Sequence, residues 1–223
     1  MTPLSWPCPL PGGAMVEEYA LVFDRAREKR LLIVPALFDE GNRLRRFTVE
    51  VMRRLDGAGV DVFLPDYPGT NESLQPLPTQ EPDDWADAMT AAGLEFGATH
   101  VLGIRGGCLF TPSALPSLHY APVKAASLLR QMLRARILSS REIGREETRE
   151  GLMALGLALG IELAGYQLGA EFVRQFDTLT PREGVAQIAQ DTVGGSGLWL
   201  RAEPSESAEQ ADALAAAVAM ALA

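Results

Sequence analysis

The segment Gly103-Ile104-Arg105-Gly106-Gly107 has the residue types and spacing that come nearest to a catalytic device. Its glycines are spaced as in the G-x-S-x-G turn, which holds a nucleophilic serine exposed between a strand and a helix. Arg105 stands where that serine would be. Because a guanidinium stays protonated and has no nucleophilic lone pair at neutral pH, acyl transfer through this position is excluded. A plain tight turn is the alternative interpretation of this segment alone.

Two roles are open for Arg105. At the carboxyl end of a sheet strand it could bind a carboxylate or a phosphate in a bidentate manner. The other role, which we favour, is a structural salt bridge to one of the carboxylates that follow neighbouring strands. Ligands gather at the carboxyl ends of parallel strands. The predicted ligand-binding residues are therefore Arg105, Asp39, Glu40, Asp66 and Tyr67, and three of them (Asp39, Glu40 and Asp66) are the candidate salt-bridge partners.

Cys108 and His119 are weak candidates for catalysis by another route. Cys108 with His119 as its base would form a nucleophile, and a serine such as Ser73 with His119 is a variant of the same idea. However, a buried cysteine usually behaves as a small apolar residue, and His119 lies in the apolar run 118–121. No histidine follows His119, so a late general base is missing. No catalytic residue is expected.

Composition limits the partners and the compartment. The chain has 223 residues, of which 47% are hydrophobic and 22% charged, as in a single globular domain, 1–223. A net charge of −9 predicts that neither nucleic acid nor an anionic membrane is a partner. Four prolines in residues 3–11 argue against a leader segment, and two cysteines fit a reducing compartment, so we expect a cytoplasmic protein.

No metal site and no cofactor are expected. The two cysteines and two histidines are not at metal-ligand spacing. The acidic pairs Asp39-Glu40 and Asp83-Asp84 could hold a divalent cation, but each lies beside a predicted helix start, where carboxylates interact favourably with the helix dipole. We therefore interpret both pairs as helix-start residues.

Hydrophobic periodicity predicts alternating strands and helices in the first half of the chain. The expected strands are 19–23, 31–37, 60–64 and 99–103, with helices over 44–55 and from 83 onward. We expect 19–23 and the charged turn 25–30 to form an opening hairpin. The alternation indicates right-handed crossovers and a three-layer α/β fold, in which helices cover both faces of a mostly parallel sheet.

The second half of the chain is predicted to be mainly helical. Helices are expected over 121–138 and 146–159, and 121–159 is interpreted as a helical cap or crossover insert. A strand over 161–168, a helix over 171–176, strands over 185–189 and 198–201, and a terminal helix over 206–223 complete the prediction.

Several short motifs together resemble one family. They are Ile33 to Leu37 with Asp39-Glu40, Asn42 and Arg45-Arg46; Leu64-Pro65-Asp66 with Gly69 and Ser73; Gly103-Ile104-Arg105; Tyr120 to Val123; and Leu163 to Leu168. This series resembles the exosortase A system-associated hydrolases, particularly their type-2 branch, from about residue 31 to the C-terminus. The resemblance implies an α/β-hydrolase fold and a setting in exopolysaccharide production and protein sorting.

The chain departs from that pattern after the glycine-rich turn. Only eleven residues separate Gly107 from His119, and they include Pro112 and Pro116. A hydrolase has a long buried helix and then a strand at this point, so we expect the helix to be reduced to a stub. This loss would also remove a helix N-terminus that helps to form an oxyanion hole.

Three functions are therefore considered. The first is a pseudo-hydrolase that binds a small anionic ligand or a protein partner without catalysis. The alternative is an active serine or cysteine esterase or thioesterase with an atypical catalytic set. The third is a scaffold that forms a homodimer through its alanine-rich tail.

Overall fold

A seven-stranded sheet organises the molecule, and the computed structural model describes residues 1–222. The strand order is β1-β2-β4-β3-β5-β6-β9. The bounds are β1 Thr2–Pro9, β2 Met15–Phe23, β3 Arg30–Val34, β4 Asp61–Pro65, β5 His100–Ile104, β6 Ser117–Tyr120 and β9 Ala186–Ile188. The pairs β1-β2 and β2-β4 are antiparallel. The pairs β4-β3, β3-β5, β5-β6 and β6-β9 are parallel. The predicted α/β class is confirmed.

The central strands form because their sequences are continuous apolar runs. Leu31 to Val34 on β3 and Val62 to Pro65 on β4 are apolar and buried, as expected for strands that are covered on both faces. The register places Val34 beside Gly103 and Gly103 beside His119. The carboxyl ends of β3, β5 and β6 therefore meet at one edge of the sheet.

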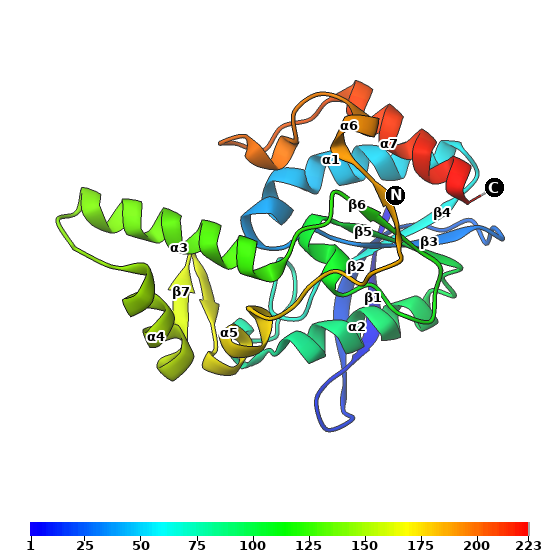
Figure 1. Ribbon diagram of the computed structural model, residues 1–223. Coiled ribbons are helices and arrows are strands. Elements are labelled where there is room, and N and C mark those ends of the chain that lie inside the picture. The colour runs from blue at the N-terminus through cyan, green and yellow to red at the C-terminus, as the bar shows by residue number, and fades with distance from the viewer. Residues whose placement is uncertain (223) are drawn as a thin grey trace.

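Helices cover both faces (Figure 1). α1 (Phe38–Gly57), α6 (Gln190–Val193) and α7 (Ala208–Ala221) lie on one face, and α2 (Pro82–Glu95) lies on the other. Leu44, Phe47, Val51 and Leu55 recur at helical spacing on α1 and are buried against the sheet. A capping box starts α2, in which the side chain of Asp84 accepts a hydrogen bond from the backbone N–H of Glu81.

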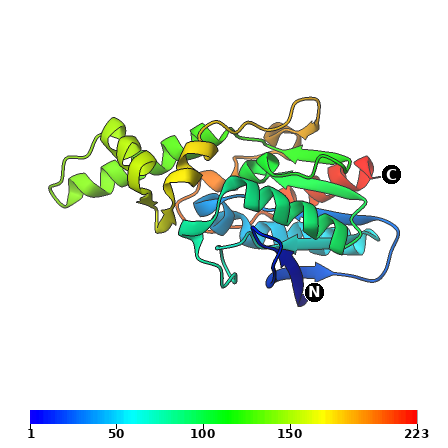
Figure 2. The same cartoon turned by 90° about the horizontal axis from the view of Figure 1, so that it is seen from below.

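A lobe inserted between β6 and β9 projects from this body (Figures 1 and 2). It consists of α3 (Ala125–Glu142), α4 (Arg149–Leu159), β7 (Ile161–Leu163), β8 (Tyr166–Leu168) and α5 (Ala170–Phe176). The two helices expected in 121–159 are present, and their action as a cap stays a prediction. Within residues 1–222, none of the helices combines the length and hydropathy that a bilayer-spanning segment needs.

Three of the elements expected from the sequence differ from those in the structure. The strand expected over 161–168 is a hairpin, because the backbone reverses at Ala164 and Gly165, whose φ angles are 52° and 82°. Residues Leu198–Leu200, expected as a strand, form a 3-10 helix instead. Strand β2 forms a hairpin with β1, which precedes it, and the expected hairpin with the charged turn 25–30 is not formed. Pro3, Pro7 and Pro9 are tolerated in β1 because it is an edge strand.

Candidate functional site

The turn after β5 has the geometry of a nucleophile elbow. Arg105, at its apex, has a φ of 54°, which is uncommon for a residue other than glycine. A Cβ on Gly103 would lie 2.9 Å from the Cα of Cys108, and a Cβ on Gly107 would lie 2.2 Å from the carbonyl oxygen of Val34. Both positions therefore require glycine. Only a 3-10 helix, Arg105–Leu109, follows, so the predicted shortening is confirmed.

Glu40 and the backbone of Ala121 hold the guanidinium of Arg105. Its Nε donates to Oε2 of Glu40 at 3.0 Å, its Nη2 to Oε1 at 2.9 Å, and its Nη1 to the carbonyl oxygen of Ala121 at 2.8 Å. The side chains of Arg105 and Glu40 are 12% and 3% exposed. This pairing is the one that the salt-bridge interpretation predicts.

Trp199 covers the same guanidinium, and sequence reasoning missed it. The guanidinium carbon lies 4.1 Å from the centroid of the Trp199 ring, as in a cation-π contact. Tyr120 packs edge-on against Trp199, with ring centroids 6.1 Å apart, and its hydroxyl donates a hydrogen bond to Gln190 at 2.5 Å. The only sequence signal was a short apolar segment, which gives no information about the residue that it covers.

Asp66 and Tyr67 follow β4 but have partners of their own. Oδ1 of Asp66 accepts hydrogen bonds from Arg45 at 2.7 Å and from Asn71 at 3.0 Å, while Oδ2 is buried without a partner. The hydroxyl of Tyr67 donates to the carbonyl oxygen of Pro35 at 3.2 Å, and burial raises its pKa well above the usual value. Within residues 1–222, no hydrogen bond or ion pair connects these two residues to Arg105.

Asp39 also lies apart from Arg105. Its half-exposed carboxylate faces Arg43 on the next turn of α1, at 3.6 Å. Asp39 and Glu40 both lie in the first turn of α1, which agrees with their interpretation as helix-start residues. Of the five predicted ligand-binding residues, the structure therefore joins only Arg105 and Glu40.

Cys108 and His119 are not arranged as a nucleophile and its base. The thiol of Cys108 points to the carbonyl oxygen of Tyr120 at 3.9 Å, and burial raises its pKa, which disfavours the reactive thiolate. Nε2 of His119 lies 3.0 Å from the hydroxyl of Thr111. No hydrogen bond in the described chain joins the two residues.

The hydroxyl of Ser73, the alternative nucleophile, is also hydrogen-bonded to groups other than His119. Its hydroxyl donates to the buried carboxyl group of Glu18 at 2.8 Å and accepts from the backbone N–H of Gly69 at 2.8 Å. Burial raises the pKa of Glu18. Ser73 therefore serves to hold the loop after β4 against β2.

No group of three or more His, Cys, Asp and Glu side chains that could hold a metal ion is found in residues 1–222.

Protonation of His119 is expected to destabilise the protein in mild acid. Burial, followed by the charge of Arg182, lowers its pKa from 6.5 to about 4. As the pH falls below 6.5, the unfolded chain takes up the proton first, so stability that is complete above pH 6.5 is lost between there and about pH 4. The expected loss at pH 5 is about 2 kcal/mol of unfolding free energy.

Urea denaturation at pH 7.5 and pH 5 measures this effect. The substitution His119→Gln should reduce the difference in unfolding free energy between the two pH values. An equal pH dependence in wild type and His119→Gln would show that another group is responsible.

Aromatic side chains leave little space at the carboxyl edge of the sheet. One pocket, beside Phe38, Tyr67, Trp85 and Tyr166, has a volume of about 20 Å³, and another, between α1 and α3, about 60 Å³. Tyr67 and Trp85 pack with ring centroids 4.7 Å apart, and Phe38 and Tyr166 with centroids 5.2 Å apart. Typical small-molecule sites have volumes of roughly 300–1,000 Å³. The first pocket has room for about one water molecule.

Comparison with known proteins identifies the fold. No family model matches the chain, and no curated protein is similar to it in sequence. Est1E from Butyrivibrio proteoclasticus, solved with bound ferulic acid, has a TM-score of 0.52 at 14% identity, over 92% of this chain and 92% of its own. A putative hydrolase from Agrobacterium vitis S4 has a TM-score of 0.51 at 14% identity, over 99% and 98%. At such identities the likeness concerns the fold alone, and this chain has an α/β-hydrolase fold.

Proposed function

We propose that this chain is a non-catalytic protein built on the α/β-hydrolase fold. The observation that carries the proposal is the occupant of the elbow: Arg105 stands at the apex and is held by Glu40 and covered by Trp199. A side chain with no nucleophilic lone pair cannot attack an acyl group, and this one is also tied down by a buried carboxylate. The elbow has kept its backbone shape and carries an ion pair instead of a nucleophile.

The surroundings of the elbow support the same proposal. The pockets beside it have volumes of about 20 and 60 Å³, too small for an ester substrate. Cys108 and His119, the remaining candidates, are buried and have separate partners. An atypical esterase or thioesterase, the alternative function, would need both residues to leave these partners and turn toward one another.

Purified wild-type protein is expected to hydrolyse neither p-nitrophenyl esters nor thioesters above the rate in buffer. His119→Ala and Cys108→Ala should give the same baseline, because neither residue has a catalytic partner. The measurement is a panel of acyl chain lengths, followed by absorbance, together with labelling by a fluorophosphonate probe. Turnover by the wild type that falls in either variant would favour the atypical esterase instead.

We also propose a setting in an exosortase-associated exopolysaccharide system. Its support is the resemblance of the motifs after β3, β4 and β5, and of Tyr120 to Val123 and Leu163 to Leu168, to the type-2 branch of that hydrolase group. Exopolysaccharide yield in the host with and without the coding gene tests this part, and an unchanged yield would count against it.

A further inference from the structure

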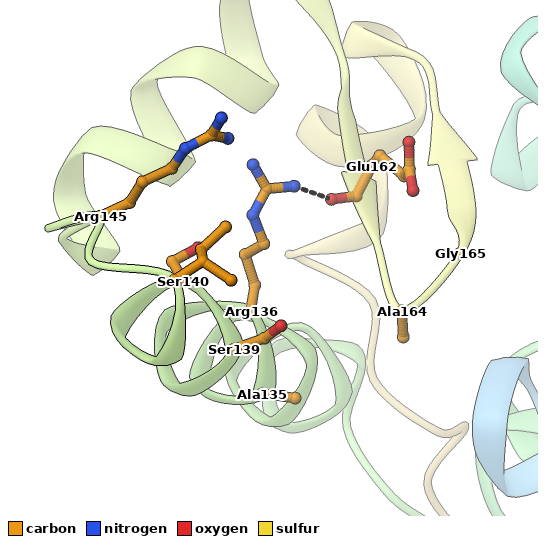
Figure 3. A pocket seen from close by; sticks show the side chains of 9 residues that line it. Ala135, Arg136, Ser139, Ser140, Arg145, Glu162, Ala164 and Gly165 are labelled. Atoms are coloured by element: carbon orange, nitrogen blue, oxygen red, sulfur yellow. Dashed lines mark hydrogen bonds between the residues drawn. The ribbon is translucent and has the colours of Figure 1, made fainter.

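A pocket large enough for a small molecule lies in the projecting lobe, away from the elbow. A pocket of about 460 Å³ opens between the C-terminal half of α3, the α3–α4 connection and the turn between β7 and β8 (Figure 3). This volume is within the range of small-molecule sites, unlike those beside Arg105. The inference drawn from it goes beyond the proposed function, because it does not depend on whether the elbow is catalytic.

Arg136 forms a fixed, positively charged part of the pocket wall. Its Nε and Nη2 both donate to the carboxylate of Glu147 at 2.9 Å, and its Nη1 donates to the carbonyl oxygen of Glu162 at 3.1 Å. Figure 3 shows the carboxylate of Glu162 pointing away from Arg136. Ser140 binds the same carboxylate of Glu147 at 2.5 Å. Glu147 is therefore held in place and neutralises Arg136.

Arg145 supplies a second guanidinium that has no such partner. No ion pair or side-chain hydrogen bond to Arg145 exists among residues 1–222, although its backbone N–H is fixed by the carbonyl oxygen of Ser140 at 2.8 Å. Its charge nevertheless acts at the same place, since Arg145 contributes, after Arg136 and Ser140, to lowering the pKa of Glu147. Both guanidinium groups therefore act on the carboxylate of Glu147, but only Arg136 is paired with it.

The charge of the surrounding segment is opposite to that of the chain. Residues 124–145 carry six basic side chains and one acidic one, although the net charge of the chain is −9. Glu162 also lines the pocket, with its carboxylate directed away from Arg136. The remaining wall is small or apolar, with Ala135, Ile143 and Ala164, and the hydroxyl of Ser139 is an additional donor. Guanidinium groups bind carboxylates and phosphates through paired hydrogen bonds.

We propose that this pocket binds a small organic anion, whose carboxylate or phosphate group is held by Arg145 and whose compact apolar part contacts Ile143 and Ala164. Arg136 positions the site through Glu147, and Ser139 donates a further hydrogen bond. The negative charge of the ligand compensates the guanidinium that the protein leaves unpaired.

Isothermal titration calorimetry with phenyl phosphate, benzoate and benzyl alcohol tests the proposal at constant ionic strength. The two anions should bind more tightly than the uncharged alcohol, and their relative affinities distinguish phosphate from carboxylate recognition. Arg145→Gln should weaken binding by roughly tenfold or more, because a charge-assisted pair of hydrogen bonds is lost. Arg141→Gln is the matched control, since Arg141 is exposed in the same lobe but does not line the pocket.

Circular dichroism of both variants verifies that the lobe is folded. Equal weakening by Arg145→Gln and Arg141→Gln would overturn the proposal, because it would show a diffuse effect of charge rather than a site. Failure of both anions to bind better than benzyl alcohol to the wild type would overturn it as well. Neither result bears on ester hydrolysis, so this proposal and the proposed function can fail separately.

Discussion

Replacing Arg105 by alanine is expected to lower the free energy of unfolding by about 3–5 kcal/mol. The substitution removes both hydrogen bonds to Glu40, whose side chain is only 3% exposed, and leaves a buried carboxylate without its partner. It also uncovers the face of Trp199 that now packs on the guanidinium. Urea denaturation followed by tryptophan fluorescence and by circular dichroism measures the loss.

Arg46→Ala is the matched control. Arg46 pairs with Glu206 at 2.5 Å, but its side chain is 68% exposed, so the expected cost is below about 1 kcal/mol. The double substitution Arg105→Ala with Glu40→Leu should recover part of the stability lost by Arg105→Ala, because no charge is then left buried. If Arg105→Ala costs no more than Arg46→Ala, the ion pair does not hold the elbow.

Gly107→Ala is expected to cost about 3 kcal/mol or more, or to prevent folding. The added Cβ would lie 2.2 Å from the carbonyl oxygen of Val34 and 2.4 Å from that of Pro35. These are backbone atoms at the end of β3, so the clash cannot be relieved by rotating a side chain. The melting temperature and the yield of folded protein report the effect.

Gly57→Ala, at the end of α1, provides the comparison. A Cβ at Gly57 meets nothing within 4 Å, and alanine is the better helix former, so the variant should be as stable as the wild type or slightly more stable. Normal stability of Gly107→Ala would mean that the turn after β5 is looser than its contacts indicate.

The sequence was sufficient for the centre of the fold because local pattern and burial agree there. β3 and β4 are short apolar runs, and α1 repeats its apolar residues at helical spacing, so each element could be predicted without its neighbours. β1 could not be predicted in this way, because prolines argue against a strand unless its position at the sheet edge is known. That position is a property of the whole chain.

The site was harder to predict than the fold, since its contacts join distant segments. Arg105 had three carboxylates among its candidate partners, and only the folded chain shows that Glu40 is the one within reach. Arg105 and Trp199 are in contact although more than ninety residues separate them in the sequence, and no local pattern predicts this contact. The glycines of the turn could be recognised because their spacing matches a known turn motif, although the contact that requires Gly107 is with the distant backbone of Val34.

The two borders of the sheet also determine how copies of this protein can associate. β1 carries prolines at positions 3, 7 and 9, which supply no N–H to an incoming polypeptide, and β9, at the opposite border, is only three residues long. Edge strands that are short or contain proline resist pairing with strands of other molecules, and so resist fibril formation. Any homodimer of this protein should therefore assemble through helical surfaces, and its sheet should remain closed to growth.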